Sequence, residues 1–174
     1  MQIPAPIFES FAQERSWYMG DKSFHYTNEQ MVKDLLKLIT IKGSVLDAGS
    51  GKNKVWFNNL KGEKYECEIE DGCDFYAWDK KVDWIVSNPP FHESWKFTEK
   101  AVGIARKGIA WLINNQALNS HMTPARLDWL REQGFTYSKI HVVADKRWFG
   151  RFYFIVLEKS TKKLELSWER KTYG

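Results

Sequence analysis

The sequence has little of what marks a secreted, metal-binding or membrane protein. It contains only two cysteines, Cys67 and Cys73, and no histidine at metal-ligand spacing from them. We therefore expect reduced packing residues in a cytoplasmic protein, without a disulfide framework and without a metal site. The opening residues lack a basic segment followed by an apolar run, and no apolar stretch is long enough to span a bilayer. These absences lead us to expect no signal peptide and no membrane partner.

The composition that is present fits one folded domain. Of the 174 residues, 43% are hydrophobic and 16% are aromatic, and the nine Trp exceed what a core of this size needs. Some rings are therefore expected to be half-exposed, where they can stack on a base or a partner. The net charge of +4 fits a polyanionic partner, but an ordinary protein with a small lysine excess explains it equally well.

Strand and helix patterns alternate along most of the chain and favour an α/β fold. We expect an N-terminal arm over residues 1–23, one α/β domain over 24–160 and a peripheral basic tail over 161–174. Alternation predicts a mostly parallel sheet covered on both faces. The loop 144–150 is too short for a crossover, so the two strands that flank it must be antiparallel. The expected strands are 44–48, 65–70, 82–86, 108–114, 137–143 and 151–159. The first expected helix begins near residue 27 and is ended by Lys42-Gly43, and the second follows the glycine turn to about residue 60. Two further helices are expected over 91–106 and 124–133.

A glycine-rich turn follows the first expected strand. Residues 45–51 read VLDAGSG, and bare backbone at such a turn can approach a ligand at the carboxyl edge of the sheet. The turn lacks the glycine spacing of a phosphate-binding loop, and Lys54 replaces the last glycine of the dinucleotide pattern. A plain strand–turn–helix remains the alternative. The residues expected to border a cofactor here are Asp47, Ala48, Gly49 and Gly51.

Acids and an aromatic residue follow the second expected strand. Glu68 comes after the glycine turn at close to the roughly 20-residue spacing at which an acid reaches a ribose hydroxyl in nucleotide-binding α/β folds, and Glu70 is the nearby alternative. Asp74 could accept an adenine amino hydrogen while the ring of Phe75 covers the base. Taken alone, each acid is equally well explained as an exposed residue at a strand end.

The strongest motif is the tetrapeptide Asn88-Pro89-Pro90-Phe91, which ends the third expected strand. Two stiff prolines after a buried strand fix the neighbouring side chains in place. The Asn88 amide oxygen and the Pro89 carbonyl can accept the two hydrogens of an amino group, and Phe91 can stack on the attached ring. Such acceptors pull the lone pair of nitrogen out of conjugation and aim it at an electrophile. The motif therefore predicts catalysis at an amino nitrogen.

Four motifs in this order, VLDAGSG, CEIE, CDF and SNPPF, resemble the class I methyltransferases that use S-adenosylmethionine. The NPPF form is similar to the amino-methylating branch, which acts on adenine N6 in DNA or on adenine N6 or guanine N2 in RNA. The resemblance implies S-adenosylmethionine as cofactor, a Rossmann-like sheet with an antiparallel C-terminal hairpin, and Asn88 beside the cofactor. In the adenine-N6 group the motif that binds the cofactor carboxylate precedes the glycine turn, so the resemblance implies this role for Tyr26 and Thr27.

Three departures from the family pattern bear on the target. Residues 71–82 are too few for the helix and strand that the family places there, so we expect a sheet trimmed at one edge, with 72–80 as a loop over the cofactor. No segment resembles a target-recognition domain, which implies a recognition subunit or a homodimer. His92 directly after the motif also occurs in RNA guanine-N2 enzymes. DNA adenine N6 stays slightly ahead of RNA as the expected target.

The loop between the last two expected strands is a candidate contact with nucleic acid. It combines cations with aromatic rings, the mixture that grips phosphates and stacks on bases. A hairpin with a solvated tip explains it equally well. Asn114, Asn115 and Gln116 end the strand 108–114 near the same edge and are further candidates for the pocket. The residues expected to contact the substrate are His92, Lys146, Arg147, Trp148 and Arg151.

Overall fold

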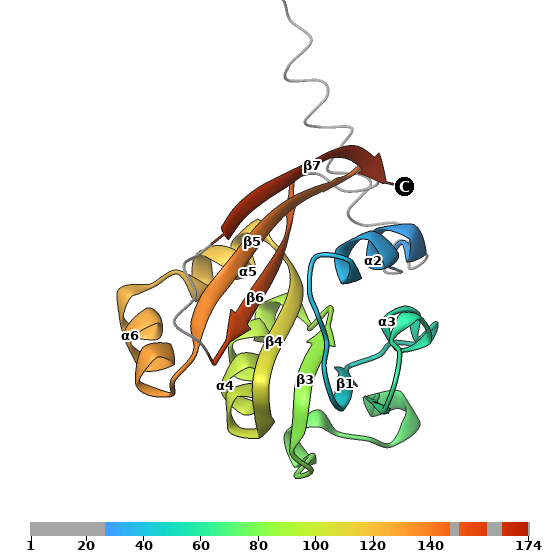
Figure 1. Cartoon of the computed structure of the whole chain (residues 1–174), viewed down its shortest axis with the longest axis vertical. Coiled ribbons are helices and arrows are strands. Elements are labelled where there is room, and N and C mark those ends of the chain that lie inside the picture. Colours follow the sequence, from blue (N-terminus) through green and yellow to red (C-terminus); the bar gives the residue numbers. More distant parts are fainter. Residues whose placement is uncertain (1–26, 147–149, 160–164, 174) are drawn as a thin grey trace, which may run out of the picture.

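A seven-stranded sheet with the order β2-β1-β3-β4-β6-β5-β7 forms the centre of the computed structural model, which describes residues 27–146, 150–159 and 165–173 (Figure 1). The strands are β1 (Val45–Ala48), β2 (Lys64–Cys67), β3 (Val82–Ser87), β4 (Ala105–Asn114), β5 (Thr136–Asp145), β6 (Phe152–Glu158) and β7 (Glu165–Tyr173). The α-helices are α2 (Glu29–Leu36), α3 (Val55–Asn59), α4 (Ser94–Ile104), α5 (Asn115–His121) and α6 (Pro124–Glu132), and the 3-10 turns are η2 (Ile69–Asp71), η3 (Phe75–Ala77) and η4 (Phe91–Glu93).

The pairing of the strands confirms the expected Rossmann-like α/β sheet. β2, β1, β3 and β4 are parallel, and β6 lies antiparallel between β4 and β5. Parallel strands place their carboxyl ends at one edge, so the turns that follow β1, β2, β3 and β4 meet there.

Helices cover both faces of the sheet and create two hydrophobic cores (Figure 1). α2 and α3 pack on one face, where Val32 and Trp56 join the core around Val86 and Leu112. α4, α5 and α6 pack on the other face around Trp111. Strands buried on both faces read as continuous apolar runs, which is why the sequence predicts them well.

The edge of the sheet at β2 is trimmed, as expected from the short segment between β2 and β3. Residues 68–81 contain only the two short turns η2 and η3. The side chain of Glu68 accepts a hydrogen bond from Glu70 N and begins η2, so the strand expected over 65–70 ends at Cys67. Such a side-chain bond competes with the ladder of the sheet for the same backbone.

Several other expected boundaries were wrong because pairing with neighbouring strands decides them. The helix expected over 91–106 begins as η4 and ends at Ile104, since Ala105 already pairs with Val82 in the sheet. The loop expected over 144–150 is shorter, because β5 continues to Asp145.

Two elements were not anticipated from the sequence. α5 follows directly on β4, and the Asn114 side chain caps it by accepting from Ala117 N at 2.9 Å. β7 lies in the stretch expected to be a peripheral tail and pairs in parallel with β5. The helices of the described segments lack the length and the apolar run that crossing a bilayer requires.

Candidate active site

A cavity of about 1010 Å³ lies at the carboxyl ends of the parallel strands. Its walls come from turns far apart in the sequence, which the sheet brings together. The lining residues are Gly49, Cys67, Glu68, Ile69, Cys73, Asp74, Phe75, Tyr76, Asn88, Pro89, Pro90, Phe91, His92, Glu93, Phe97, Asn114, Gln116, Ala117 and Ser120. The tetrapeptide at the end of β3 and two of the acids after β2, Glu68 and Asp74, therefore line one cavity.

The glycine turn presents bare backbone to this space. Gly49 and Gly51 have φ angles of 80° and 66°, which favour glycine. A Cβ atom on Gly51 would meet nothing within 4 Å, so the turn leaves room that a side chain would fill. Gly49 N donates to Cys67 O at 2.7 Å, and this bond ties the turn to the end of β2.

Glu68 and Ile69 form the wall after β2. Glu68 Oε2 accepts from Gly51 N at 2.6 Å, and Glu68 lines the cavity whereas Glu70 does not. Of the two acids considered from the sequence, Glu68 is therefore the one that lies in the cavity wall. Ile69 is 66% exposed although it is a large apolar side chain, and it also lines the cavity. Sequence reasoning missed Ile69, for which exposure in a cavity wall is the signal.

The turn η3 forms the next part of the wall. Asp74 Oδ1 accepts from Tyr76 N at 2.9 Å, and Phe75 packs with its ring centroid 4.9 Å from that of Phe97. Tyr76 Oη donates to Glu93 Oε2 at 3.3 Å, which joins the wall after β2 to the turn η4. Burial, and then the Glu93 carboxylate, raise the pKa of Tyr76 to about 12, so the phenol stays protonated and able to donate at neutral pH.

Asn88 stands where β3 ends in the cavity. Its Nδ2 donates to Thr27 Oγ1 at 3.3 Å, so the hydroxyl of Thr27 sets the orientation of the amide. The opposite amide atom, Oδ1, is buried and has no hydrogen-bond partner in the described part of the chain. A buried acceptor left unpaired costs free energy, and an incoming donor would remove that cost. Phe91 is half-buried and lines the same cavity, with its ring centroid 6.0 Å from that of Phe152.

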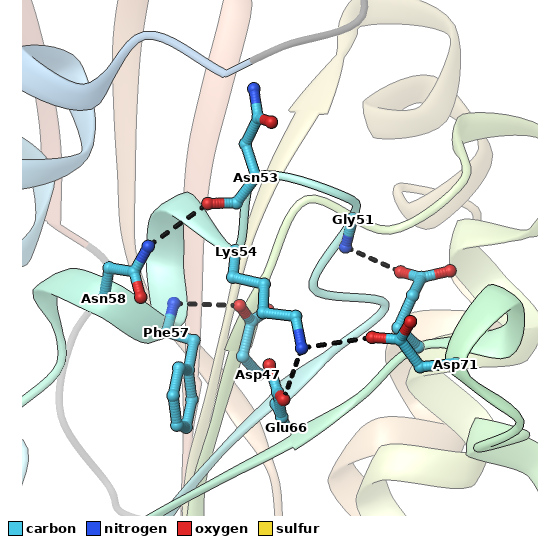
Figure 2. A network of polar contacts seen from close by, with 9 residues as sticks. Asp47, Gly51, Asn53, Lys54, Phe57, Asn58, Glu66 and Asp71 are labelled. Carbon is cyan, nitrogen blue, oxygen red and sulfur yellow. Dashed lines mark hydrogen bonds and ion pairs between the residues drawn. The ribbon is translucent and has the colours of Figure 1, made fainter.

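Asp47, which was expected to border the cofactor, caps α3 and does not line the cavity. Its Oδ2 accepts from Phe57 N at 2.9 Å (Figure 2), in place of the side-chain cap that Lys54 does not provide. Asp47 is fully buried, and Oδ1 finds no hydrogen-bond partner within the described segments. Burial raises the pKa of Asp47 to about 7.

The remaining residues singled out from the sequence divide between the cavity and other places. Asn114 and Gln116 line the cavity with His92, whereas Asn115 does not. Ala48 and Gly51 lie beside the lining residue Gly49. Lys146 and Arg151 are exposed and do not line the cavity. Tyr26, Arg147 and Trp148 lie outside the described residues.

Cys67 and Cys73 form a disulfide, so the expectation of two reduced packing residues was wrong. The turn η2 folds the chain back on itself and brings the two Cα atoms to 5.1 Å, within the range that a disulfide spans. Spacing in the sequence did not reveal this turn. Both cysteines line the cavity. Glu68 lies in the short loop that the disulfide closes. Within residues 27–146, 150–159 and 165–173, no group of three His, Cys, Asp or Glu side chains is placed to hold a metal ion.

Comparisons with known proteins support the fold. No protein-family model and no curated protein matches the sequence. A proposed class I S-adenosylmethionine-dependent methyltransferase from Listeria monocytogenes is similar in structure, with a TM-score of 0.63 and 14% identity over 94% of this chain and 72% of that one. A proposed RNA methyltransferase from Pyrococcus horikoshii gives 0.55 and 16% over 82% and 89%.

A third solved structure was determined with cofactor. The magnesium protoporphyrin IX methyltransferase from Synechocystis PCC 6803, with bound S-adenosylmethionine, gives a TM-score of 0.56 and 14% identity over 87% of this chain and 91% of that one. The three structures agree on a Rossmann-like methyltransferase fold for this chain, as its motifs predict.

Proposed function

We propose that the chain transfers a methyl group from S-adenosylmethionine to an exocyclic amino nitrogen of a nucleic-acid base, with adenine N6 in DNA as the first expected target. The observation that carries this proposal is the amide of Asn88. Its nitrogen donates to Thr27 Oγ1. Its buried oxygen has no hydrogen-bond donor in the described part of the chain, and Asn88 lines a cavity of the methyltransferase fold. An amino group is the donor that such an acceptor suits.

The residues around the cavity fit S-adenosylmethionine. Glu68 offers a carboxylate for ribose hydroxyls, and the exposed side chain of Ile69 offers an apolar surface for a flat base. Asp74 can accept an adenine amino hydrogen, and the bare backbone at Gly49 lets the rest of the cofactor approach the turn closely. When bound, the cofactor supplies a methyl group already activated on a sulfonium.

The chain's own contribution to the reaction is to orient the target nitrogen. The Asn88 amide oxygen and the Pro89 carbonyl accept the two amino hydrogens, which draws the nitrogen lone pair out of conjugation with the base and directs it at the methyl group. Phe91 stacks on the base. Holding the reactants in line is worth on the order of 7–11 kcal/mol in well-oriented systems. The nitrogen loses a proton to solvent after transfer, so no dedicated base is required.

RNA is the second candidate substrate, and His92 is the observation that favours it. His92 follows Phe91 directly and also lines the cavity, and the resulting NPPFH sequence is similar to that of RNA guanine-N2 enzymes. In a duplex the target base must be flipped into the cavity at a cost of about a few kcal/mol, which is smaller for a single strand. Single-stranded and duplex forms of both nucleic acids are therefore needed in the test.

The test is methyl transfer from labelled S-adenosylmethionine to single-stranded and duplex DNA and RNA by the full chain. Asn88→Ala removes the acceptor, and its rate is expected to fall by roughly 10²- to 10³-fold, as for the loss of one group that stabilises a transition state. Asn119→Ala deletes an exposed amide of the same kind from α5 and is expected to keep the wild-type rate.

The outcomes separate the parts of the proposal. Equal rates for Asn88→Ala and wild type would refute the mechanism. Digestion of the product to nucleosides identifies the methylated base. Label found only in RNA would show that RNA, and not DNA, is the substrate. Label in neither nucleic acid, from a chain that binds the cofactor, would reject a nucleic-acid target.

A further inference from the structure

Lys54 has an unusual backbone conformation directly after the glycine turn. Its φ of 48° and ψ of 40° place it in the left-handed region, and it is the single non-glycine residue with positive φ among those described. A long side chain in this region costs free energy and persists only where the surroundings hold it. The side chain is not spent on capping α3, so it has another use.

The ammonium of Lys54 bonds to acids on both sides of Glu68 (Figure 2). Nζ lies 2.6 Å from Glu66 Oε1 on β2 and 3.0 Å from Asp71 Oδ2 in η2. Because Glu68 lies between these two anchors in the sequence, its backbone is held at both ends. The backbone oxygen of Glu68 also accepts from Asp71 N and Cys73 N, each at 3.0 Å.

The charges around this lysine point to the same role. Glu66, Glu68, Glu70 and Asp71 stand within six residues, and like charges so close repel one another. Hydrogen bonds to Glu66 first and then to Asp71 raise the pKa of Lys54, so it stays charged at neutral pH. Lys54 therefore offsets two of the four acids and leaves the carboxylate of Glu68 as the one that faces the cavity.

We infer that Lys54 is a positioning residue that fixes Glu68 for the ribose of the cofactor by bridging Glu66 and Asp71. The inference rests on the proposed function, because it assumes a nucleoside in the cavity. Lys54 does not line the cavity itself and acts through the segment that carries Glu68.

The experiment is calorimetric titration of S-adenosylhomocysteine into the full chain and its variants. Lys54→Met removes the ammonium but keeps most of the stem, and affinity is expected to fall about tenfold, a typical effect for coupled residues in one network. Lys54→Arg keeps the charge and is expected to restore most of the affinity. Lys61→Met removes an exposed lysine after α3 and should leave affinity unchanged.

A double-mutant cycle with Glu68→Gln separates positioning from general stability. If Lys54 acts through Glu68, Lys54→Met costs much less affinity in the Glu68→Gln background than in wild type. Additive losses would overturn the inference, as would wild-type affinity in Lys54→Met. Should Lys54→Met not fold, Asp71→Asn removes one exposed anchor, and a smaller loss that also disappears in the Glu68→Gln background is expected. Failure of the wild-type chain to bind S-adenosylhomocysteine would instead reject the proposed function.

Discussion

Asp47 and His121 are buried titratable residues, and their pKa shifts make the stability of the protein depend on pH in opposite directions. Burial raises the pKa of Asp47 from 3.8 to about 7, and burial lowers the pKa of His121 from 6.5 to about 4. His121 bonds through its two ring nitrogens to Tyr137 Oη at 3.0 Å and Ser94 Oγ at 3.3 Å, so it joins three elements as a neutral ring. Its contribution to stability is present above about pH 6.5 and is lost as the pH falls towards 4.

The Asp47 contribution has the opposite sign. Between about pH 4 and 7 the folded state keeps a proton that the unfolded state has released, so this contribution is present below about pH 4 and is lost as the pH rises through about 7. Because the two residues oppose each other in one pH window, the wild-type curve alone does not resolve them. A variant must be compared with wild type at each pH.

Asp47→Asn isolates this effect. Asparagine can still accept a hydrogen bond from Phe57 N but cannot ionise. The free energy of unfolding of the variant, relative to wild type, is therefore expected to rise between pH 4 and pH 8, by at most about 1.4 kcal/mol per pH unit. Urea unfolding followed by tryptophan fluorescence at pH 5 and pH 8 measures the difference. A constant difference between the two pH values would contradict the raised pKa.

Motifs made of adjacent residues were predictable one by one, whereas contacts between distant residues were not. The NPPF tetrapeptide and Glu68 line the cavity, and each follows directly on a strand that the sequence reveals. The role of Asp47 in capping α3 depends on the short and uncapped start of that helix. The disulfide at Cys67 depends on how η2 turns, and nothing in the spacing of the cysteines shows that.

At the scale of elements, β3 and β4 approach each other closely at one glycine. Gly108 on β4 pairs with Trp84 on β3, and a Cβ atom at Gly108 would lie 2.4 Å from Trp84 Cζ3. The indole therefore occupies the space that a side chain would need, and the glycine is required by packing, since no positive φ is involved.

Gly108→Ala is expected to destabilise the protein by about 1–3 kcal/mol, the usual cost of overpacking a core. Gly103→Ala in α4 is the matched control, because a Cβ atom there meets nothing within 4 Å and alanine should stabilise the helix by about 0.5–1 kcal/mol. Thermal melting of both variants measures the contrast. Equal melting temperatures for the two alanine variants would show that Trp84 moves aside without cost.

Elements were predictable where the sequence carries their full signal. The strands β1, β3 and β4 are buried on both faces, so their apolar runs stand out. α5 escaped prediction because its seven residues follow β4 without a loop and its cap, Asn114, looked like a strand end. β7 escaped because an edge strand needs no apolar run, and its charged residues read as a solvated tail.

At the scale of the whole molecule, the pairing of β7 with β5 extends the sheet beyond its antiparallel strands (Figure 1). An open strand edge promotes association between chains, and a further strand protects it. A chain that ends at Lys159 leaves β5 without this neighbour. We expect it to melt at a lower temperature than the full chain and to associate as its concentration rises, which sedimentation velocity measures.

Two proline substitutions test the same pairing without shortening the chain. Successive residues of a strand point their N–H groups alternately towards the neighbouring strand and away from it, and proline removes the N–H group. Leu166 and Ser167 pair with Ile140 and His141, so one of Leu166→Pro and Ser167→Pro removes a bond to β5 and the other does not. One variant should resemble the shortened chain in its melting temperature and the other should lie closer to wild type. Wild-type behaviour of both variants and of the shortened chain would show that β7 adds nothing to the stability of the sheet.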